Sequence, residues 1–263
     1  MNILHLTHTD INSDSRILKE MNSIANMNSN INVSGIGVRL DEEMHKTKEN
    51  CKIDIYSIRL KSRNWRFLPT VIRHSCSLIE LTLKMIFKAL ILKPKILHCH
   101  DTLVLPLGVI IKLLTGSKLI YDAHELESNR NGLSTTLGKM TLFAEKLLWR
   151  FVDNLIVVSP SISTWYQENI GEKSTEIIMN APVLEENKLY DKNDKSYFRN
   201  KFNIPESSKI FLYIGILGIG RGIELIVESF KKNNLSSHLI FLGYGELKNT
   251  LIDVSNKYKN IHV

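Results

Sequence analysis

The chain has 263 residues, which accommodates one large domain or two ordinary ones. Hydrophobic residues make up 43% of it and charged residues 23%, values that are typical of globular proteins and exclude a disordered or fibrous chain. The formal net charge of +7 permits an anionic partner, either nucleic acid, a membrane surface or a phosphate-bearing substrate, but it also fits a lysine-rich surface in contact with solvent.

Short apolar runs alternate with helical patterns along the chain, which predicts a parallel sheet flanked by helices. Ser13 or Asp14 is expected to cap the first helix, and Ser159 followed by Pro160 to begin the helix after the sixth strand. This pattern predicts a doubly wound α/β domain over 1–183. Its expected strands are 2–7, 32–38, 52–58, 95–99, 118–122, 154–158 and 176–179.

A basic segment precedes a long amphipathic helix that begins near Ile72. Lys84 and Lys88 interrupt the apolar run, so the helix has fewer consecutive apolar residues than a membrane-spanning helix needs. We expect the apolar stripe to pack against the sheet, and a peripheral contact of 59–92 with anionic lipids at the inner face of the membrane is the alternative. The basic residues are Arg59, Lys61, Arg63 and Arg66, with Trp65 among them, and the stripe is Cys76, Ile79, Leu83, Ile86 and Leu90.

The charged stretch 184–208 contains no apolar strand and is expected to cross between two domains. A second α/β unit follows over 209–263, with strands at 210–215, 238–243 and 260–263. A unit of this size buries too little surface to be more than marginally stable. We therefore expect the second domain to be incomplete and the chain to be part of a longer protein.

The cysteines and the N-terminal residues indicate the cellular compartment in which the protein is expected. The three cysteines, Cys51, Cys76 and Cys99, form no CxxC pair, so neither a disulfide framework nor a zinc site is indicated. The first residues, MNILHLTH, reach polar side chains at once and lack the apolar stretch of a signal peptide. We expect a cytoplasmic protein.

Three expected strands end in polar side chains that could serve as acids, bases or ligands for sugar hydroxyls. Because the carboxyl ends of parallel strands meet at one edge of a sheet, where ligands of α/β proteins bind, these side chains predict one cleft. The alternative is that some of them cap the next segment or pair with one another. The residues are His8 and Asp10 after the first strand, His98, His100 and Asp101 at the fourth, and Asp122, His124 and Glu125 at the fifth.

Two further features of these strand ends leave alternatives open. Arg16, in the loop that enters the first helix, could hold an anion or pair with Asp14. The pair His98 and His100 could chelate a metal. Their apolar neighbours Leu97 and Cys99 instead indicate a strand in the hydrophobic core, and no metal site is predicted.

The run GILGIGRG, Gly215 to Gly222, follows a strand and opens a helix, which places backbone N–H groups and Arg221 at a positive helix end. A nicotinamide-binding protein would have G-x-G-x-x-G here and an acidic residue after the next strand, where this chain has Gly243 and Gly245. The spacing favours a nucleotide diphosphate, and the alternative is that these glycine-rich turns serve packing alone. No G-x-S-x-G elbow, Walker loop, HExxH or D-x-D pair occurs, which argues against the corresponding hydrolases, NTPases, zinc proteases and metal-dependent sugar transferases.

Taken in order, these motifs resemble those of retaining glycosyltransferases of the GT-B fold, family 4, over nearly the whole chain. The matching pieces are DSRILKE at 14–20, ILHCHD at 96–101, LIYDAHEL at 119–126, LIVVSPSI at 155–162, NAP at 180–182, YIGILGIGRGIELIVESF at 213–230 and IFLGYGEL at 240–247. The resemblance implies two Rossmann-like domains, the first binding the acceptor and the second, incomplete here, the nucleotide-sugar.

The resemblance also implies roles for single residues. His124 matches the histidine that reaches the donor sugar, and Arg221 the basic residue that neutralises the departing diphosphate. Ile216 stands where many members have arginine, and THTDINSDSR replaces their first glycine-rich loop. The implied donor-binding residues are Gly215, Gly220, Arg221, Gly222, Gly243 and Gly245, and the acceptor-side residues are His8, Asp10, Arg16, His100, Asp101, Asp122 and Glu125.

We therefore expect a glycosyltransferase that needs no metal or cofactor and moves a sugar from a nucleotide-sugar to a glycan or lipid-linked acceptor with retention. The family's paired glutamates, which hold the donor, would lie beyond the last residue of this chain. The alternative is a truncated, non-catalytic binding fragment. Nucleic-acid binding would rest on net charge alone, and no nucleic-acid partner is expected.

Overall fold

The computed structural model describes residues 1–39, 53–65, 67–130, 132–181, 197–232 and 236–263. The chain divides into two compact units, Met1–Ala181 and Pro182–Val263. The expected crossing, 184–208, lies outside the described residues as far as 196, and its remainder carries helix α6 (Tyr197–Phe202).

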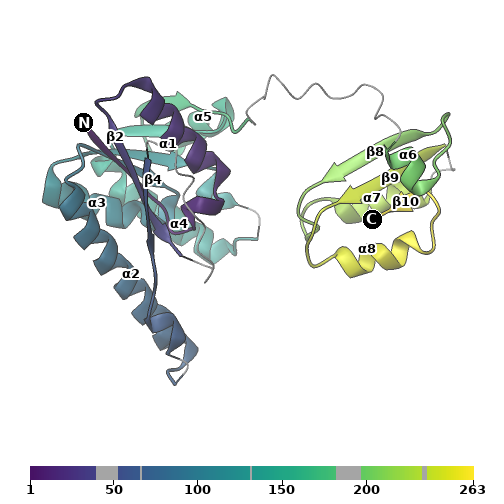
Figure 1. Ribbon diagram of the computed structural model, residues 1–263, viewed down its shortest axis with the longest axis horizontal. Helices are drawn as coiled ribbons and strands as arrows, with labels where there is room; N and C mark the ends of the chain where they lie inside the picture. The colour runs from purple at the N-terminus through teal and green to yellow at the C-terminus, as the bar shows by residue number, and fades with distance from the viewer. Residues whose placement is uncertain (40–52, 66, 131, 182–196, 233–235) are drawn as a thin grey trace. The chain divides into compact units, whose positions relative to one another are not determined.

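The first unit is built on a seven-stranded parallel sheet in the order β3-β2-β1-β4-β5-β6-β7 (Figure 1). The prediction of a parallel α/β sheet is confirmed, and the largest shift in a strand boundary is at β7, two residues earlier than expected. The strands are β1 (Asn2–Leu6), β2 (Asn32–Val38), β3 (Ile53–Ile58), β4 (Ile96–His100), β5 (Lys118–Ala123), β6 (Asn154–Val157) and β7 (Ser174–Ile177).

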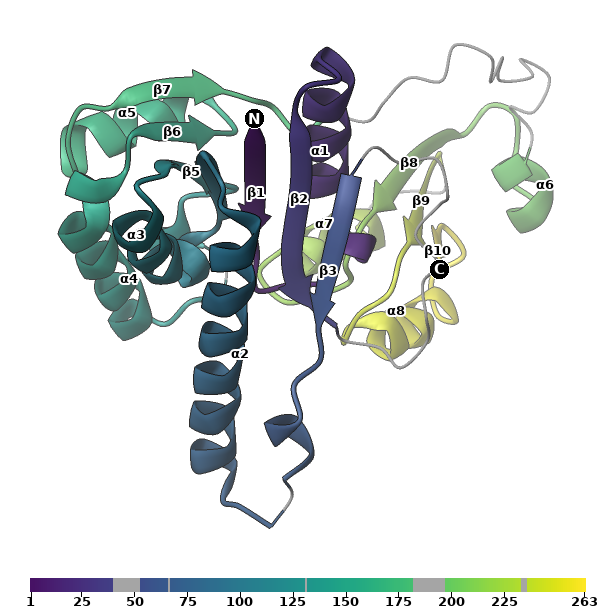
Figure 2. The ribbon, with the colours of Figure 1, turned by 60° about the vertical axis from the view of Figure 1, so that its left-hand side comes forward.

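Helices cover both faces of this sheet, and each face has its own apolar core. Figure 2 shows α2 and α3 on one face and α1 on the other. Asp14 caps α1 and Ser159 caps α5, with Pro160 in the first turn, as the sequence predicts. The α-helices of this unit are α1 (Ser15–Met27), α2 (Thr70–Leu92), α3 (Leu105–Thr115), α4 (Thr135–Leu148) and α5 (Pro160–Asn169). Short 3-10 helices are η1 (Ile11–Ser13), η2 (Ser62–Asn64), η3 (Thr102–Val104), η4 (Glu127–Asn129) and η5 (Trp149–Phe151).

Helix α2 does not pack as the sequence suggests. Met85 and Ala89 are its buried residues, whereas Ile79 and Leu83, in the expected stripe, are 59% and 62% exposed. The expectation that this stripe packs on the sheet is therefore wrong at Ile79 and Leu83, whereas Ile86 of the same stripe packs against the apolar core. The helix is apolar on more than one side, so periodicity could not select the buried face, and its first turns extend past the ends of β1 and β3 (Figure 2). Within the described residues, no helix combines the length and apolar character needed to cross a membrane.

The second unit has a three-stranded parallel sheet in the order β10-β9-β8, with its own apolar core. Leu217, within the glycine-rich run, and Ile223, directly after it, both belong to that core. The elements after α6 are β8 (Lys209–Ile214), α7 (Ile223–Lys231), β9 (Ser237–Leu242), α8 (Lys248–Ser255) and β10 (Ile261–His262).

Candidate functional site

The polar strand ends of the first unit meet at the carboxyl edge of its sheet. From β1 the chain proceeds outward to β2 and β3, and then returns to lay β4 against the other side of β1. Such a reversal of strand order is where ligands bind in open α/β sheets. The strands β1, β4 and β5 are neighbours there, and they bring together His8, His100, Asp101, Asp122 and His124.

Asp122, completely buried at the end of β5, is the centre of this cluster. Its Oδ1 accepts a hydrogen bond from Nη2 of Arg16 at 2.7 Å. Its Oδ2 lies 3.2 Å from Nε2 of His98 and 3.3 Å from Nδ1 of His100. It also lies 3.4 Å from Nε2 of His124. Burial would raise the pKa of Asp122, but hydrogen bonds from the three histidines outweigh it and hold the pKa below its ordinary value.

Arg16 is the cation that compensates the buried carboxylates. Besides its bond to Asp122, its Nε donates to Oε1 of Glu20 at 3.1 Å. Asp14 instead caps α1, accepting the backbone N–H groups of Arg16 and Ile17 at 3.1 and 3.2 Å. The alternative in which Arg16 pairs with Asp14 is therefore wrong. The anions that Arg16 holds in this structure are the carboxylates of Asp122 and Glu20.

Three imidazoles form a chain from the core to the surface. Nδ1 of His5 lies 2.9 Å from Nε2 of His100, and Nδ1 of His100 lies 3.1 Å from Nε2 of His124. Burial lowers the pKa of His5 well below its usual value and that of His100 to about 3. Burial also acts to lower the pKa of His124, but its hydrogen bond to Asp122 and the charges of Asp122 and Asp101 raise it above the usual value. The outermost imidazole, 20% exposed, is therefore the one that takes up a proton most readily.

The remaining residues expected on the acceptor side, His8, Asp10 and Glu125, differ in their burial and in their partners. His8 is half-buried, with Nδ1 3.9 Å from Oδ2 of Asp101, and burial lowers its pKa. Asp10 is occupied locally, because its Oδ1 accepts hydrogen bonds from the backbone N–H and the side-chain amide of Asn12, each at 3.0 Å. Glu125 is exposed. Asp10 is thus a capping residue of η1, and its expected part in acceptor binding stays a prediction, as does that of Glu125.

Sequence reasoning missed two members of the cluster, His5 and Glu127. Glu127 lies in η4, is 4% exposed, and has its pKa raised to about 8, first by burial and then by the charge of Asp101. It follows the YDAHE motif by two residues, so the same strand-end loop could have drawn attention to it. His5 lies in the apolar run of β1, where a buried histidine implies a polar partner.

Two groups of side chains lie close enough to surround a metal ion. Their potential ligand atoms all lie within 4.8 Å of one another in each group. In both groups the imidazoles are already bonded to one another or to Asp122, and Arg16 supplies positive charge to the carboxylates. The arrangement thus works as an imidazole and carboxylate network, and the absence of a metal requirement stays a prediction. The groups are His5, Glu20, His98 and His100, and His100, Asp122 and His124.

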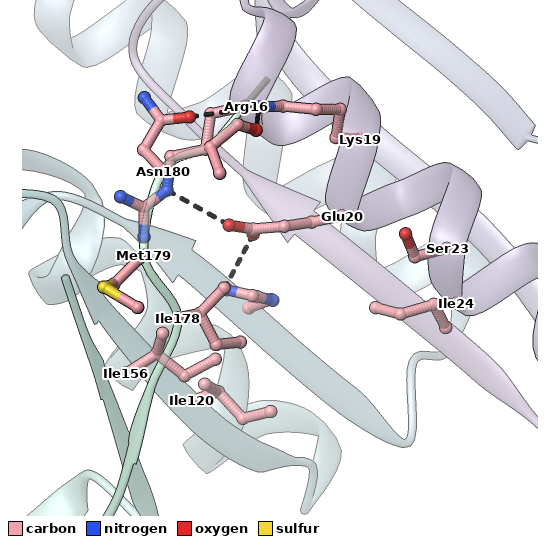
Figure 3. A pocket seen from close by; sticks show the side chains of 12 residues that line it. Arg16, Lys19, Glu20, Ser23, Ile24, Ile120, Ile156, Ile178, Met179 and Asn180 are labelled. Carbon is pink, nitrogen blue, oxygen red and sulfur yellow. Dashed lines mark hydrogen bonds and ion pairs between the residues drawn. The ribbon is translucent and has the colours of Figure 1, made fainter. Parts of the chain in front are cut away.

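A cavity of about 320 Å³ lies between α1 and the segment after β7, and Arg16, Glu20 and His98 of the network line it. Figure 3 shows Arg16 and Glu20 at its polar end. Lys19 borders it and donates hydrogen bonds to the carbonyl of Ala181 and the side chain of Asn180, at 2.6 and 3.1 Å. Its apolar wall is formed by Ile24, Ile120, Ile156, Ile178 and Met179.

In the second unit, two glycine-containing loops pack directly against each other. A Cβ at Gly243 would lie 1.8 Å from the carbonyl oxygen of Gly215, and one at Gly245 would lie 2.4 Å from that of Leu217. The backbone N–H of Leu217 donates to the carbonyl of Tyr244 at 2.7 Å. Gly243 and Gly245 are therefore required for the contact between the loops, to which Gly215 contributes its carbonyl oxygen, and the expected donor contacts of all three stay predictions.

Gly220 and Gly222 lie just before the first turn of α7, away from the contact between the two loops. Both have positive φ, 78° and 71°, and no atom lies within 4 Å of the place of a Cβ. Arg221 between them is exposed. The backbone N–H groups at the start of a helix attract anions. The structure thus places an exposed basic side chain between two glycines at the start of α7, and the expected anion site stays a prediction.

Comparison with known proteins gives a consistent picture of the fold. No protein-family profile matches the chain. The chain is 29% identical over 161 residues to the uncharacterized glycosyltransferase MJ1059 of Methanocaldococcus jannaschii, a match that covers 59% of this chain and 38% of that relative. It therefore spans well under half the length of this curated relative.

Among solved structures, sucrose-phosphate synthase from Thermosynechococcus elongatus superposes with a TM-score of 0.70 at 14% identity, over 100% of this chain and 70% of that one. Anabaena HepE in complex with UDP superposes with a TM-score of 0.68 at 14% identity, over 100% of this chain and 68% of that one. Identities this low establish fold alone. The chain has the GT-B fold that these glycosyltransferases share, with a seven-stranded first sheet and a smaller second one.

Proposed function

We propose that this chain belongs to an enzyme that transfers a sugar, with retention and without a metal, from a nucleotide-sugar to a glycan or lipid-linked acceptor. The observation that carries the proposal is His124, held between Asp122 and Asp101 at the carboxyl edge of a GT-B sheet. Names of related proteins support it. A Salmonella typhimurium lipopolysaccharide 1,2-N-acetylglucosaminetransferase is 27% identical over 93 residues, and Anabaena HepE has been solved with UDP-glucose.

The mechanism we propose is electrostatic. Breaking the bond between the sugar and the diphosphate builds negative charge on the leaving group and positive charge on the sugar. Arg221 and the N–H groups at the start of α7 would stabilise the former, because preorganised donors are worth most where charge develops. His124, with both ring nitrogens engaged, would present a fixed imidazole edge to the donor sugar. His8, Asp101 and Glu125 would bind the acceptor.

A panel of UDP-, GDP- and ADP-sugars tests the proposal. We expect one nucleotide series to raise the melting temperature of the chain or to be hydrolysed by it, with Arg221→Ala reducing the response. In a full-length version the same substitution should lower turnover about 10²-fold to 10³-fold. Lys257→Ala, which removes an exposed charge of the same sign from the second unit, is the matched control. Unchanged turnover in Arg221→Ala would remove this residue from the site.

The same panel separates the enzyme from a binding fragment. If neither hydrolysis nor a change in melting temperature occurs with any donor, the chain as it stands is a non-catalytic fragment. If the parent reading frame then continues into further α/β sequence, the test is repeated on that longer protein.

We also propose that the first unit contacts the inner face of the membrane from the cytoplasm, where a lipid-linked acceptor would be presented. Phe67, just before α2, and Val71, in its first turn, are 79% and 77% exposed, and Lys61 and Arg63 of the preceding segment are exposed as well. Arg66, also expected to take part, lies outside the described residues. Exposed aromatic and basic side chains together favour anionic lipid surfaces. These turns of α2 extend from the carboxyl edge of the sheet, where His124 lies (Figure 2).

Sedimentation with vesicles tests the membrane contact. We expect binding to vesicles that contain phosphatidylglycerol, weaker binding at high salt, and little binding to phosphatidylcholine alone. Phe67→Glu should abolish the binding, whereas Met27→Glu, an exposed apolar residue at the end of α1, should not. Equal binding by Phe67→Glu and the unmodified chain would exclude this surface.

A further inference from the structure

Another cavity of the first unit, of about 370 Å³, lies between the loop after β5, α4 and α5. Leu126, which lines it, follows His124 by two positions, so the loop that carries His124 continues into the wall of this cavity. Cavities of about 300 to 1,000 Å³ are typical of small-molecule sites. This one is large enough for one small ligand, and it begins next to His124 along the chain.

The apolar part of the lining contains one aromatic ring, the indole of Trp165. The other apolar side chains are Leu126, Leu133 and Leu142. The indole stands edge-on against the ring of Tyr166, with centroids 5.4 Å apart. Tyr166 is itself completely buried, stacks on Trp149 with centroids 5.8 Å apart, and donates a hydrogen bond to Oε1 of Glu145 at 2.6 Å. The indole is therefore held in place before a ligand arrives, and its ordering costs little on binding.

A close backbone contact joins two walls of the cavity, η4 and the first turns of α4. A Cβ at Gly138 would lie 2.5 Å from the carbonyl oxygen of Ser128, which is nearer than a side chain allows. Both residues line the cavity. Its shape on this side therefore depends on the absence of a side chain at Gly138.

The polar side chains of the lining have hydrogen-bonding groups that the protein itself does not use. Four of them form no hydrogen bond or ion pair within the described part of the chain, namely Ser128, Asn129, Thr135 and Lys139. The hydroxyl oxygen of Ser134 accepts the backbone N–H of Leu137 at 3.3 Å, and its O–H remains available to donate. Hydroxyl, amide and ammonium groups thus offer both donors and acceptors beside the apolar surface.

We propose that this cavity binds one sugar residue of the acceptor, with a face of the sugar ring against Trp165 and its hydroxyl groups bonded to the polar side chains. A sugar ring has C–H groups on its faces and hydroxyl groups at its edge, and each hydroxyl can both donate and accept. An apolar ligand would take water from the polar side chains without replacing their hydrogen bonds. A cationic ligand would meet Lys139 and no carboxylate among the described residues that line the cavity.

Tryptophan fluorescence of the full chain, measured without any donor, tests the proposal. The probes are maltose, lactose, chitobiose and a disaccharide that contains glucuronic acid. We expect at least one of them to change the fluorescence at millimolar concentration, because Trp165 is one of three tryptophans in the chain. No response to any of the four sugars would overturn the proposal. A response to cyclohexanol alone would likewise overturn it, since the cavity would then be an apolar site.

Trp165→Leu should abolish the response to the sugar. The substitution removes the indole but leaves an apolar side chain to pack against the core. Trp65→Leu, the same change in the basic segment before α2, is the matched control and should retain the response. A response that persists in Trp165→Leu would contradict stacking on this residue.

Asn129→Ala tests the polar side of the cavity, because this exposed side chain can be removed without disturbing the core. It should weaken sugar binding by about 3-fold to 10-fold, the loss expected for one hydrogen bond. Asn154→Ala, which removes an exposed amide at the first residue of β6, should bind as the unmodified chain does. Equal affinity of these two variants would contradict the proposed hydrogen bonding.

The inference rests on the proposed function only in identifying the bound sugar as part of the acceptor. A chain that binds these sugars but does not respond to the nucleotide-sugar panel keeps this site and loses the proposed activity. A chain that responds to the nucleotide-sugar panel but to none of the four disaccharides loses this site alone.

Discussion

The two units present polar groups to a ligand in opposite ways. In the first unit, side chains from α1, β4 and β5 converge on Asp122, and both of its carboxylate oxygens have partners within the protein. In the second unit, Gly220 and Gly222 leave open space where a Cβ would stand, and Arg221 between them is exposed. The first arrangement fixes the orientation of one imidazole between two carboxylates, and the second exposes a basic side chain between two glycines. Substitutions around Asp122 and at the contact between Gly243 and Gly215 should accordingly reduce stability. Substitution of Arg221 should instead reduce ligand binding.

The largest effect is expected for Asp122→Asn. It leaves the guanidinium of Arg16 buried without its main partner, and breaking one side of a buried ion pair costs about 3 to 5 kcal/mol of unfolding free energy. All three tryptophans, Trp65, Trp149 and Trp165, lie in the first unit, so denaturant unfolding followed by tryptophan fluorescence reports on it specifically. Glu125→Gln, at an exposed position of the same loop, should change stability by less than about 0.5 kcal/mol. Equal stability of the two variants would show that Asp122 and Arg16 are not coupled.

A smaller effect is expected for Gly243→Ala in the second unit. The added methyl group meets the carbonyl of Gly215, so the loops must separate, at about 1 to 3 kcal/mol. Gly218→Ala is the control, because its Cβ would meet only ordinary contacts, the nearest at 3.6 Å. Hydrogen exchange of amides in β8 and β9 measures the loss locally, while tryptophan fluorescence should not change. Similar exchange in both variants would contradict the close loop contact.

The third prediction concerns pH. In the folded chain Glu127 keeps its proton up to about pH 8, whereas in the unfolded chain it is released near its ordinary value of 4.5. The folded state therefore binds more protons between these values, and stability falls as pH rises through that range, by at most about 1.4 kcal/mol per pH unit. Glu127→Gln removes this loss, so its melting temperature should rise above that of the unmodified chain progressively from pH 5 to pH 8. A constant difference between the two proteins over that range would contradict the prediction.

The smallest effect on stability is expected for Arg221→Ala. The side chain is exposed, and exposed substitutions outside special features change unfolding free energy by less than about 0.5 kcal/mol. Hydrogen exchange in α7 should therefore match that of the unmodified chain. Marked destabilisation would mean that Arg221 has a structural role that its exposure does not reveal, and would weaken its assignment to an anion site.

Much of the fold followed from periodicity in the sequence, because strands buried on both faces are short continuous apolar runs bounded by turns. The site was located by the rule that parallel strands end at one edge, which brought His100, Asp122 and His124 together as expected. The rule does not predict which side chains form hydrogen bonds with one another. Arg16 bonds to a residue 106 positions away, and a local pairing with Asp14 was equally compatible with the sequence.

The remaining differences have similar physical causes. The buried face of α2 depends on how far the helix extends past the sheet, which apolar residues on more than one side of the helix do not encode. Glu127 is important because of its burial beside Asp101, and burial of a loop residue depends on the surrounding fold. The glycines at 243 and 245 were assigned to donor binding from their pattern, whereas their immediate surroundings are another loop.

The bond between Arg16 and Asp122 also has a consequence for the order of folding. It joins α1 to the fifth strand, 106 residues later in the chain, and closing so long a loop carries a large entropic cost that only a formed sheet offsets. The histidines that converge on Asp122 therefore acquire their final arrangement late, after β1, β4 and β5 are aligned. A partly folded or nascent chain has no assembled site, so the protonation chemistry of His124 is confined to molecules whose first sheet is complete.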